Sequence, residues 1–225
     1  MSTFAIQTLN AISPVGLQRL DRDVFDIGTD IAEPRALLLR SADLHAVEIP
    51  ESVYAVARAG AGTNNIPVER LAARGIPVFN TPGANANAVK ELVIAGMLLA
   101  ARNLFHAADY TRDLVAGQAL SGKDLDKQVE AGKKQFAGFE LPGRTLGVIG
   151  LGAIGVLVAN AAQSLGLKVL GYDPAITVER AWQLSPQVEQ VTSVEELFSR
   201  SDMVTPHVPL VEGTKGLVDA HRISL

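Results

Sequence analysis

The sequence predicts a protein of the α/β class, in which helices cover parallel β-sheets. Short apolar segments alternate with turns and helical segments, a rhythm typical of parallel strands joined by crossover helices. Several apolar segments are continuous rather than alternating, as expected for strands covered on both faces. A glycine-rich turn at residues 150–155 also joins an apolar segment directly to a helical one. Together these patterns indicate two domains, each built on its own parallel sheet.

The first third of the chain contains four predicted strands and one short helix. The run Ala36–Leu39 is continuously apolar, which fits a buried strand. Residues 52–59 read as a strand that ends in the tight turn Gly60-Ala61-Gly62. A helix is expected over residues 68–74, with Gly75 closing it. The predicted strands are residues 4–9, 36–39, 52–59 and 77–80.

Turn-forming residues predict a domain boundary in the segment Asn80-Thr81-Pro82-Gly83. We therefore expect a first domain over residues 1–81 and a second over residues 82–225. Residues 87–104 are rich in Leu, Ala, Met and Val and predict a long helix. The segment 117–143 is polar and glycine-rich, and we expect a loop there with a partly helical excursion.

The remainder of the chain predicts a second parallel sheet. Residues 153–165 are expected to form a helix that Gly166 ends. Ser193 and Glu196 have the spacing of a capping box, which predicts a short helix beginning there. The predicted strands are residues 145–149, 167–172, 188–192 and 203–205.

The motif Gly150-Leu-Gly152-Ala-Ile-Gly155 is the most informative feature of the sequence. It follows a predicted strand and opens a predicted helix, the context of a dinucleotide-binding turn. Gly150 would permit the sharp turn, Gly152 would let a pyrophosphate approach the backbone, and Gly155 would let helix and strand pack closely. The helix N-terminus at Ala153 and Ile154 would offer unpaired N–H groups to the phosphates. The alternative is a purely structural turn.

Asp173 ends the next predicted strand, 18 residues after Gly155, where an acidic residue is expected at a distance of about 20. Its carboxylate can accept both ribose hydroxyls of an adenosine and would repel a 2′-phosphate. The next arginine in the chain is Arg180, so no cation lies beside Asp173 in sequence. The predicted cofactor is therefore NAD rather than NADP.

A complete Rossmann domain contains two βαβαβ halves, and the second half is incomplete in this chain. The predicted fold is thus α/β with two doubly wound parallel-sheet domains, Rossmann- or flavodoxin-like, the second incomplete. We expect the chain to be a fragment of a longer enzyme.

Composition argues against several other classes of protein. The 20 basic and 24 acidic residues give a net charge of −4 without a basic block, which argues against a nucleic-acid partner. The absence of cysteine excludes disulfides, Cys-ligated metals and a thiol nucleophile. The longest apolar run, residues 92–101, is half of the roughly 20 residues that a membrane span needs. We expect a cytoplasmic protein with no metal and no membrane contact.

Several motifs together resemble the NAD-dependent D-2-hydroxyacid dehydrogenases. They are the glycine-rich turn at 150–155, Gly171-Tyr-Asp-Pro174 and His207-Val-Pro-Leu210. The segments 39–41, 58–65 and 79–91 narrow the resemblance to family members that oxidise D-3-phosphoglycerate in the first step of phosphorylated serine biosynthesis. The resemblance implies two doubly wound domains with the active site in the cleft between them.

The resemblance assigns substrate-binding roles to residues of the first domain. It places a phosphate on Arg40 and Arg58, with help from Ser41, and a carboxylate on the backbone of Gly60-Ala61-Gly62. It also places a substrate contact at Asn85. Guanidinium forks suit phosphate, and ligands bind at the carboxyl ends of parallel strands. Alternatively, the arginines form surface ion pairs and Asn85 caps a helix.

The resemblance assigns His207, Val208 and Pro209 to the nicotinamide side of the cofactor site, not to proton transfer. Pro206 departs from the family, which more often has a strand residue there. The family's catalytic arginine, glutamate and histidine match no residue here and are expected beyond Leu225.

Three functions follow as hypotheses. The first is oxidation of a small phosphorylated hydroxy acid by NAD. The alternatives are a glyoxylate or hydroxypyruvate reductase, and a non-catalytic NAD-binding regulator, since a fold does not determine function. The helix 87–104 is apolar over much of its surface, and the resemblance implies that it packs across a two-fold interface, so we expect a homodimer or higher homo-oligomer. Alternatively, the helix is simply buried in the domain core.

Overall fold

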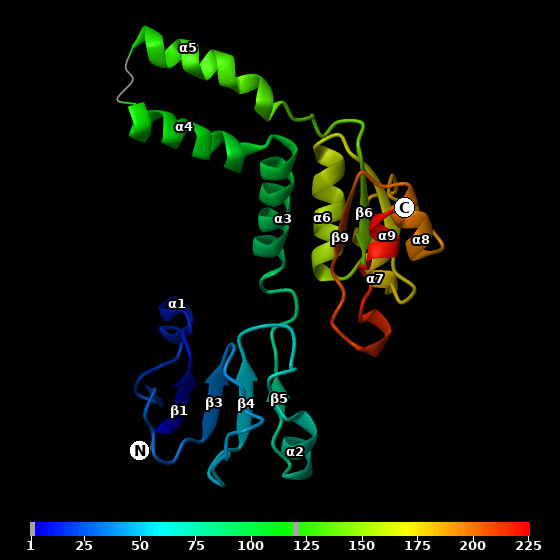
Figure 1. Ribbon diagram of the computed structural model, residues 1–225. Helices are drawn as coiled ribbons and strands as arrows, with labels where there is room; N and C mark the ends of the chain where they lie inside the picture. The colour runs from blue at the N-terminus through cyan, green and yellow to red at the C-terminus, as the bar shows by residue number, and fades with distance from the viewer. Residues whose placement is uncertain (1–2, 119–121) are drawn as a thin grey trace. The chain divides into compact units, whose positions relative to one another are not determined.

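The computed structural model describes residues 3–118 and 122–225. It divides into two compact units, Met1–Asn85 and Ala86–Leu225, which we describe separately. Each unit contains one parallel sheet flanked by helices (Figure 1). The predicted α/β class is confirmed.

The first unit is a five-stranded sheet in the order β2-β1-β3-β4-β5, with every pair of strands parallel. This order is that of flavodoxin-like folds. β4 is shorter than predicted, and β2 was not predicted. The strands are β1 (Phe4–Leu9), β2 (Phe25–Gly28), β3 (Ala36–Leu39), β4 (Ala55–Arg58) and β5 (Val78–Phe79), and the helices are α1 (Pro14–Leu17) and α2 (Val68–Ala73).

Apolar side chains from β3, β4 and α2 form the core of the first unit. Leu39, Val56 and Leu71 are fully buried. Gly75 follows α2 with φ of +71°, as expected for a glycine that ends a helix. Strands β3 and β4 end at the same level of the sheet, with Leu39 paired opposite Arg58. Polar residues after these strands therefore meet at one edge.

The second unit is a four-stranded parallel sheet in the order β8-β7-β6-β9. This order matches the first four strands of a Rossmann sheet, with the topological switch point between β6 and β9. The strands are β6 (Thr145–Ile149), β7 (Lys168–Tyr172), β8 (Glu189–Gln190) and β9 (Met203–Pro206). The crossover helices and later turns are α6 (Ala153–Ser164), α7 (Val178–Gln183), α8 (Val194–Ser199), η2 (Glu212–Thr214) and α9 (Ala220–Ile223).

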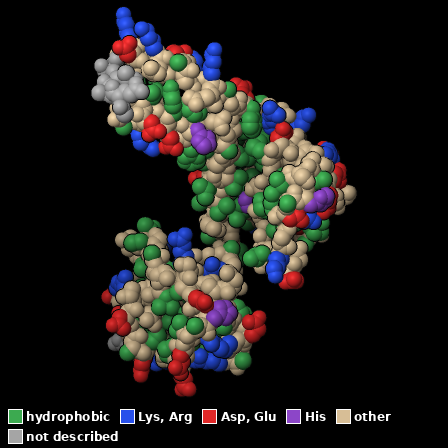
Figure 2. All heavy atoms as spheres, in the orientation of Figure 1, with side chains coloured by type: hydrophobic (Ala, Val, Ile, Leu, Met, Phe, Trp, Pro, Cys, Tyr) green, Lys and Arg blue, Asp and Glu red, His purple; other side chains and the backbone are tan. Residues whose placement is uncertain are grey.

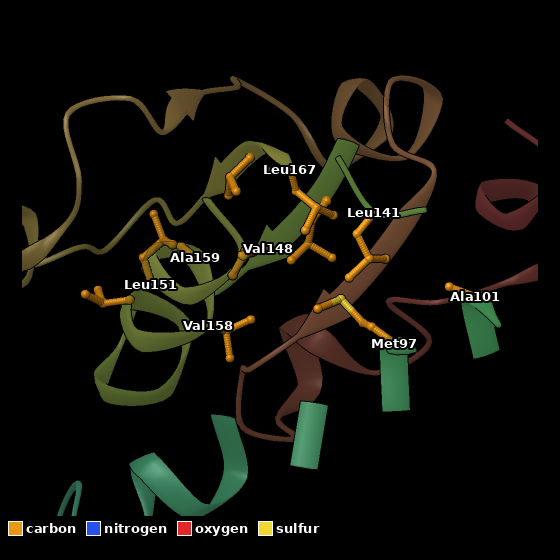
Figure 3. Packing of buried hydrophobic residues seen from close by; sticks show 12 residues of the cluster. Met97, Ala101, Leu141, Val148, Leu151, Val158, Ala159 and Leu167 are labelled. Carbon is orange, nitrogen blue, oxygen red and sulfur yellow. The ribbon is translucent and has the colours of Figure 1, made fainter. Parts of the chain in front are cut away.

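The larger buried cluster of the second unit lies between the sheet and helices α6 and α3 (Ala86–Ala101), and a smaller cluster involves α8. Val148 of β6 and Val158 of α6 are fully buried, and Met97 of α3 belongs to the same cluster (Figure 3). The predicted helix at 194 is present. Its first residues are capped by Ser193 Oγ, which accepts from the N–H of Glu196 at 3.1 Å. The Glu196 carboxylate reaches Thr192 rather than Ser193, so only one half of the predicted capping box forms.

Three further elements follow α3, namely α4 (Leu104–Gln118), α5 (Lys123–Gly132) and η1 (Lys133–Phe136). The predicted helix 87–104 ends at Ala101, because Asn103 adopts φ of +50° and the chain turns into α4. The helical excursion predicted within 117–143 corresponds to α5, while residues 119–121 lie outside the described residues. Across the described ranges, every helix is too short or too polar to cross a membrane.

Candidate functional site

A glycine turn at the carboxyl end of β6 forms the centre of the second unit's candidate site. Gly150 has φ of +87°, and its N–H donates to the carbonyl of Tyr172 at 2.8 Å. A side chain there would also meet the His207 carbonyl at 2.8 Å and Val208 at 2.7 Å. Both the backbone angle and the lack of space therefore require glycine at position 150.

The other two glycines of the motif face different surroundings. A Cβ at Gly155 would overlap the carbonyl oxygen of Gly150. The backbone of α6 therefore packs directly against the backbone of the turn, with no side chain between them. A Cβ at Gly152 would meet no atom within 4 Å and would project into open space. No described side chain caps α6, which leaves the N–H groups of its first turn, at Ala153 and Ile154, available. This edge can hold a pyrophosphate.

Asp173 ties the turn to the end of β7. One carboxylate oxygen accepts from the N–H of Leu151 at 2.8 Å, and the other accepts from the N–H of Ala175 at 2.9 Å. A carboxylate has about four lone-pair sites, so each oxygen keeps the capacity to accept another hydrogen bond. Asp173 therefore supports the glycine turn and can also accept hydroxyl groups of a ligand.

The loop after β9 lies against the same turn. The N–H of His207 donates to the carbonyl of Ile149 at 2.7 Å, and its Nε2 lies 3.0 Å from the Thr205 hydroxyl. Burial of the ring lowers the pKa of His207 below its ordinary value. Pro206 forms the last residue of β9, so this departure from the family pattern is accommodated in the sheet. His207, Val208 and Pro209 thus follow β9 beside the switch point.

An apolar groove of about 690 Å³ lies beside Asp173, which forms part of its lining. Trp182, the single tryptophan of the chain, lines this groove and is 86% exposed. The indole is therefore a natural optical reporter for events at this end of the second unit.

The carboxyl edge of the first unit gathers a second set of predicted residues. Arg40 and Ser41 follow β3 and are exposed. Asn10 follows β1 with φ of +67°, and its Oδ1 accepts from the N–H of Ser41 at 3.2 Å. Asn10 was not predicted; its position after β1, at the same edge, is the signal that could have identified it.

Arg58, at the end of β4, points its guanidinium at the backbone of two loops. Nε donates to the carbonyl of Arg40 at 2.9 Å, and Nη1 donates to the carbonyl of Gly62. In the described parts of the chain, neither Arg40 nor Arg58 makes a salt bridge. The structure therefore does not support the alternative that Arg58 is a surface ion-pair residue.

The structure brings most predicted residues together within two separate sets. Gly150, Gly152–Gly155, Asp173 and His207–Pro209 share the carboxyl edge of the second sheet. Arg40, Ser41, Arg58 and Gly60–Gly62 share that of the first. Asn85 is exposed, lies directly before α3 and forms no hydrogen bond with either set among the described residues.

Comparison with known proteins identifies the family. The family described as "D-isomer specific 2-hydroxyacid dehydrogenase, NAD binding domain" matches residues 94–225, more than half of the chain. The chain belongs to this family. The family assignment supports the predicted cofactor, NAD, and agrees with the Rossmann order of the second sheet.

The relatives include two enzymes with different names. The chain is 40% identical over 179 residues to D-3-phosphoglycerate dehydrogenase of Methanocaldococcus jannaschii, covering 80% of this chain and 31% of that protein. It is 36% identical over 200 residues to hydroxypyruvate reductase of Thermotoga maritima, covering 86% and 58%. The chain thus spans about a third of the first relative's length.

A solved structure shows the same arrangement of strands and helices. It is the NAD⁺-bound 3-phosphoglycerate dehydrogenase of Entamoeba histolytica, which is 25% identical with a TM-score of 0.68. The match covers 99% of this chain and 68% of that one.

Proposed function

We propose that this 2-hydroxyacid dehydrogenase chain binds NAD at the carboxyl edge of the second sheet. Three features of this edge suit the cofactor: the open space beside Gly152, the uncapped first turn of α6 and the remaining lone pairs of the Asp173 carboxylate. The turn would hold the pyrophosphate, Asp173 would accept the ribose hydroxyls, and the loop after β9 would line the nicotinamide side. The proposed cofactor residues are Gly150, Gly152, Ala153, Ile154, Gly155, Asp173, His207, Val208 and Pro209.

The proposed substrate is D-3-phosphoglycerate, oxidised to 3-phosphohydroxypyruvate as the first step of phosphorylated serine biosynthesis. NAD supplies the hydride acceptor when it is bound. Arg40 carries this proposal, because it is an exposed guanidinium at the carboxyl end of β3, free of any carboxylate partner in the described chain. It can bind a phosphate without first giving up an ion pair. The likeness to the M. jannaschii enzyme supports the same substrate.

The remaining substrate-binding residues of the first unit would contact different parts of the substrate. The backbone N–H groups of Gly60–Gly62 would bind the carboxylate. The Ser41 hydroxyl would assist Arg40 at the phosphate, and Asn85 would contact the substrate from the segment before α3. Nε and Nη1 of Arg58 already donate to other groups, and Nη2 has no acceptor among the described residues, so Nη2 could donate to the phosphate.

Paired ligands test the phosphate assignment. Calorimetric titration of the full chain is expected to show D-3-phosphoglycerate binding more tightly than D-glycerate. Arg40→Ala should remove most of that difference, about tenfold, because it removes one charge-assisted pair. Binding of NADH, followed by energy transfer from Trp182, should not change.

Arg35→Ala is the matched control. Arg35 lies just before β3, at the opposite end of the strand from Arg40, where it bonds the Tyr54 hydroxyl at 2.8 Å. The Arg35→Ala variant should still bind D-3-phosphoglycerate more tightly than D-glycerate. Equal affinity for the two acids in the wild-type chain would instead favour an unphosphorylated substrate, as in the T. maritima reductase.

We also propose that α3 and α4 pair with a second copy of the chain. Leu92 is 74% exposed on α3, and Phe105 is 67% exposed on α4. Hydrophobic side chains gather along α3 in the space-filling view (Figure 2). An exposed apolar face of this kind typically marks an interface. The paired substitution Leu92→Glu and Phe105→Glu should halve the mass measured by light scattering, while Val178→Glu on α7 should not. A monomeric wild-type chain would contradict the proposal.

A further inference from the structure

The turn after β4 has three consecutive carbonyl groups that are held by other parts of the first unit. The Gly60 carbonyl accepts from the N–H of Thr81 at 2.9 Å. The Ala61 carbonyl accepts from Nδ2 of Asn80 at 2.6 Å. The Gly62 carbonyl accepts from Arg58. The two peptide units that begin at Gly60 and Ala61 are therefore oriented by the segment directly after β5, the neighbouring strand.

Peptide geometry fixes where the N–H groups of this turn point. Each peptide bond is planar and trans, so an N–H points opposite to the carbonyl of the preceding residue. Carbonyls held towards Asn80, Thr81 and Arg58 therefore turn the N–H groups of residues 61–63 the other way. Within the described residues, these three N–H groups have no hydrogen-bond acceptor. Successive unpaired N–H groups form an anion-binding concavity.

We propose that Asn80 is a positioning residue for this anion site. Of the three donors, it is the only side chain that comes from the segment after β5, and it holds the central carbonyl. It would act without touching the ligand, by keeping the Gly62 N–H aimed outward. The inference rests on the proposed function, in which this turn binds the substrate carboxylate, and adds a residue to which neither the sequence pattern nor the resemblance gave a binding role.

The alternative to a positioning role is that the bond only stabilises the loop. Asn80 is exposed, and so are Ala61 and Gly62, so the hydrogen bond lies at the surface. A loop-stabilising bond would change the stability of the first unit without changing carboxylate affinity at temperatures where the unit is folded. The two roles therefore differ in a measurable way.

The test compares D-glycerate with D-3-phosphoglycerate on the full chain. Asn80→Asp replaces the donating amide by an oxygen of the same size, which would face the Ala61 carbonyl and repel it. Both ligands should bind about tenfold more weakly, by the same factor, because the carboxylate end is common to them. NADH binding should be unchanged. The amide resonances of Ala61, Gly62 and Thr63 should shift on addition of D-glycerate in the wild-type chain and much less in the variant.

Asn160→Asp provides the matched control. Nδ2 of Asn160 donates to the carbonyl of Gln183 at 2.9 Å in the second unit, which is the same kind of bond away from the anion turn. This variant should bind both acids like the wild type. Asn80→Ala, which removes the donor without adding a charge, provides a second variant if Asn80→Asp does not fold, and should show the same loss.

The outcomes separate the two claims. Wild-type affinity for both acids in Asn80→Asp and Asn80→Ala would overturn the positioning role and leave the proposed function in place. Loss of D-3-phosphoglycerate binding alone would also overturn it, because Asn80 would then act at the phosphate. A wild-type chain that binds neither acid would overturn the proposed function itself, and this inference with it.

Discussion

The two units carry similar glycine turns that are built in different ways. Gly60-Ala61-Gly62 and Gly150-Leu151-Gly152 both follow a parallel strand, at the edge where ligands bind in α/β folds. In the second turn, Gly150 has φ of +87° and backbone packs directly on backbone. In the first, neither Gly60 nor Gly62 adopts a left-handed angle. Its carbonyls are instead held by Thr81, Asn80 and Arg58.

This difference determines which substitutions should disrupt each turn. The closely packed second turn depends on Gly150 and Gly155, because a side chain at either position would overlap neighbouring atoms. A turn held by hydrogen-bond donors depends on the donors, and its glycines are replaceable where space allows. Replacement of glycine by alanine should therefore be costly at Gly155 of the second turn and tolerated at Gly60 of the first.

Gly155→Ala should have the largest effect. Its Cβ would overlap the Gly150 carbonyl oxygen, which is backbone and cannot move aside without distorting both β6 and α6. We expect a loss of roughly 3 kcal/mol in the unfolding free energy of the second unit. Urea unfolding followed by Trp182 fluorescence measures this, since Trp182 lies in α7. Gly213→Ala, where a Cβ meets no atom within 4 Å, is the control and should cost little. An unchanged midpoint in Gly155→Ala would contradict close packing at this turn.

Gly152→Ala should separate binding from stability. A Cβ at Gly152 meets nothing in the protein but would enter the space proposed for the pyrophosphate. The unfolding free energy should stay within about 0.5 kcal/mol of the wild type, as for an unstrained surface substitution. NADH affinity should fall at least tenfold, as measured by energy transfer from Trp182. Unchanged NADH affinity in Gly152→Ala would mean that the pyrophosphate does not bind at this turn.

The contrast also explains what the sequence could predict. The second turn is local, because strand, turn and helix are contiguous from Thr145 to Ser164, and residue spacing alone indicates them. Asn80 lies 19 residues after Ala61, and its hydrogen bond forms only because β4 and β5 pair in register. A turn pattern at Asn80 therefore predicted a boundary but not the contact with Ala61.

The missed elements have related causes. β2 is a short edge strand, so half-exposed residues weaken its apolar pattern. Helix α4 contacts α3, α5 and η1 rather than the sheet. Phe105 and Val115 on α4 are exposed, so no regular apolar stripe indicates a helix there.

His207 should make the stability of the second turn depend on pH. Burial lowers the pKa of the folded imidazole below the ordinary value of about 6.5 that it regains on unfolding. At pH values between the folded and unfolded pKa, the unfolded chain binds more protons than the folded chain. The unfolding free energy therefore has its highest contribution from His207 above pH 6.5 and falls as the pH decreases. Urea unfolding at pH 5.5 and 7.5 should show this, and His207→Gln should reduce the difference. Two of the partners of the first turn, Asn80 and Thr81, carry no ionisable side chain.

Gly60→Ala should have the smallest effect and would sharpen the comparison most directly. The new Cβ would lie 3.5 Å from Nε of Arg58, an ordinary van der Waals contact, and the backbone angle suits any residue. We expect the stability of the first unit to stay within about 0.5 kcal/mol, measured by hydrogen exchange of the β4 amides. D-Glycerate affinity should stay within twofold, because the donors that hold the carbonyls remain. A large loss of affinity would mean that the first turn also depends on its glycines, and the distinction between the two turns would then fail.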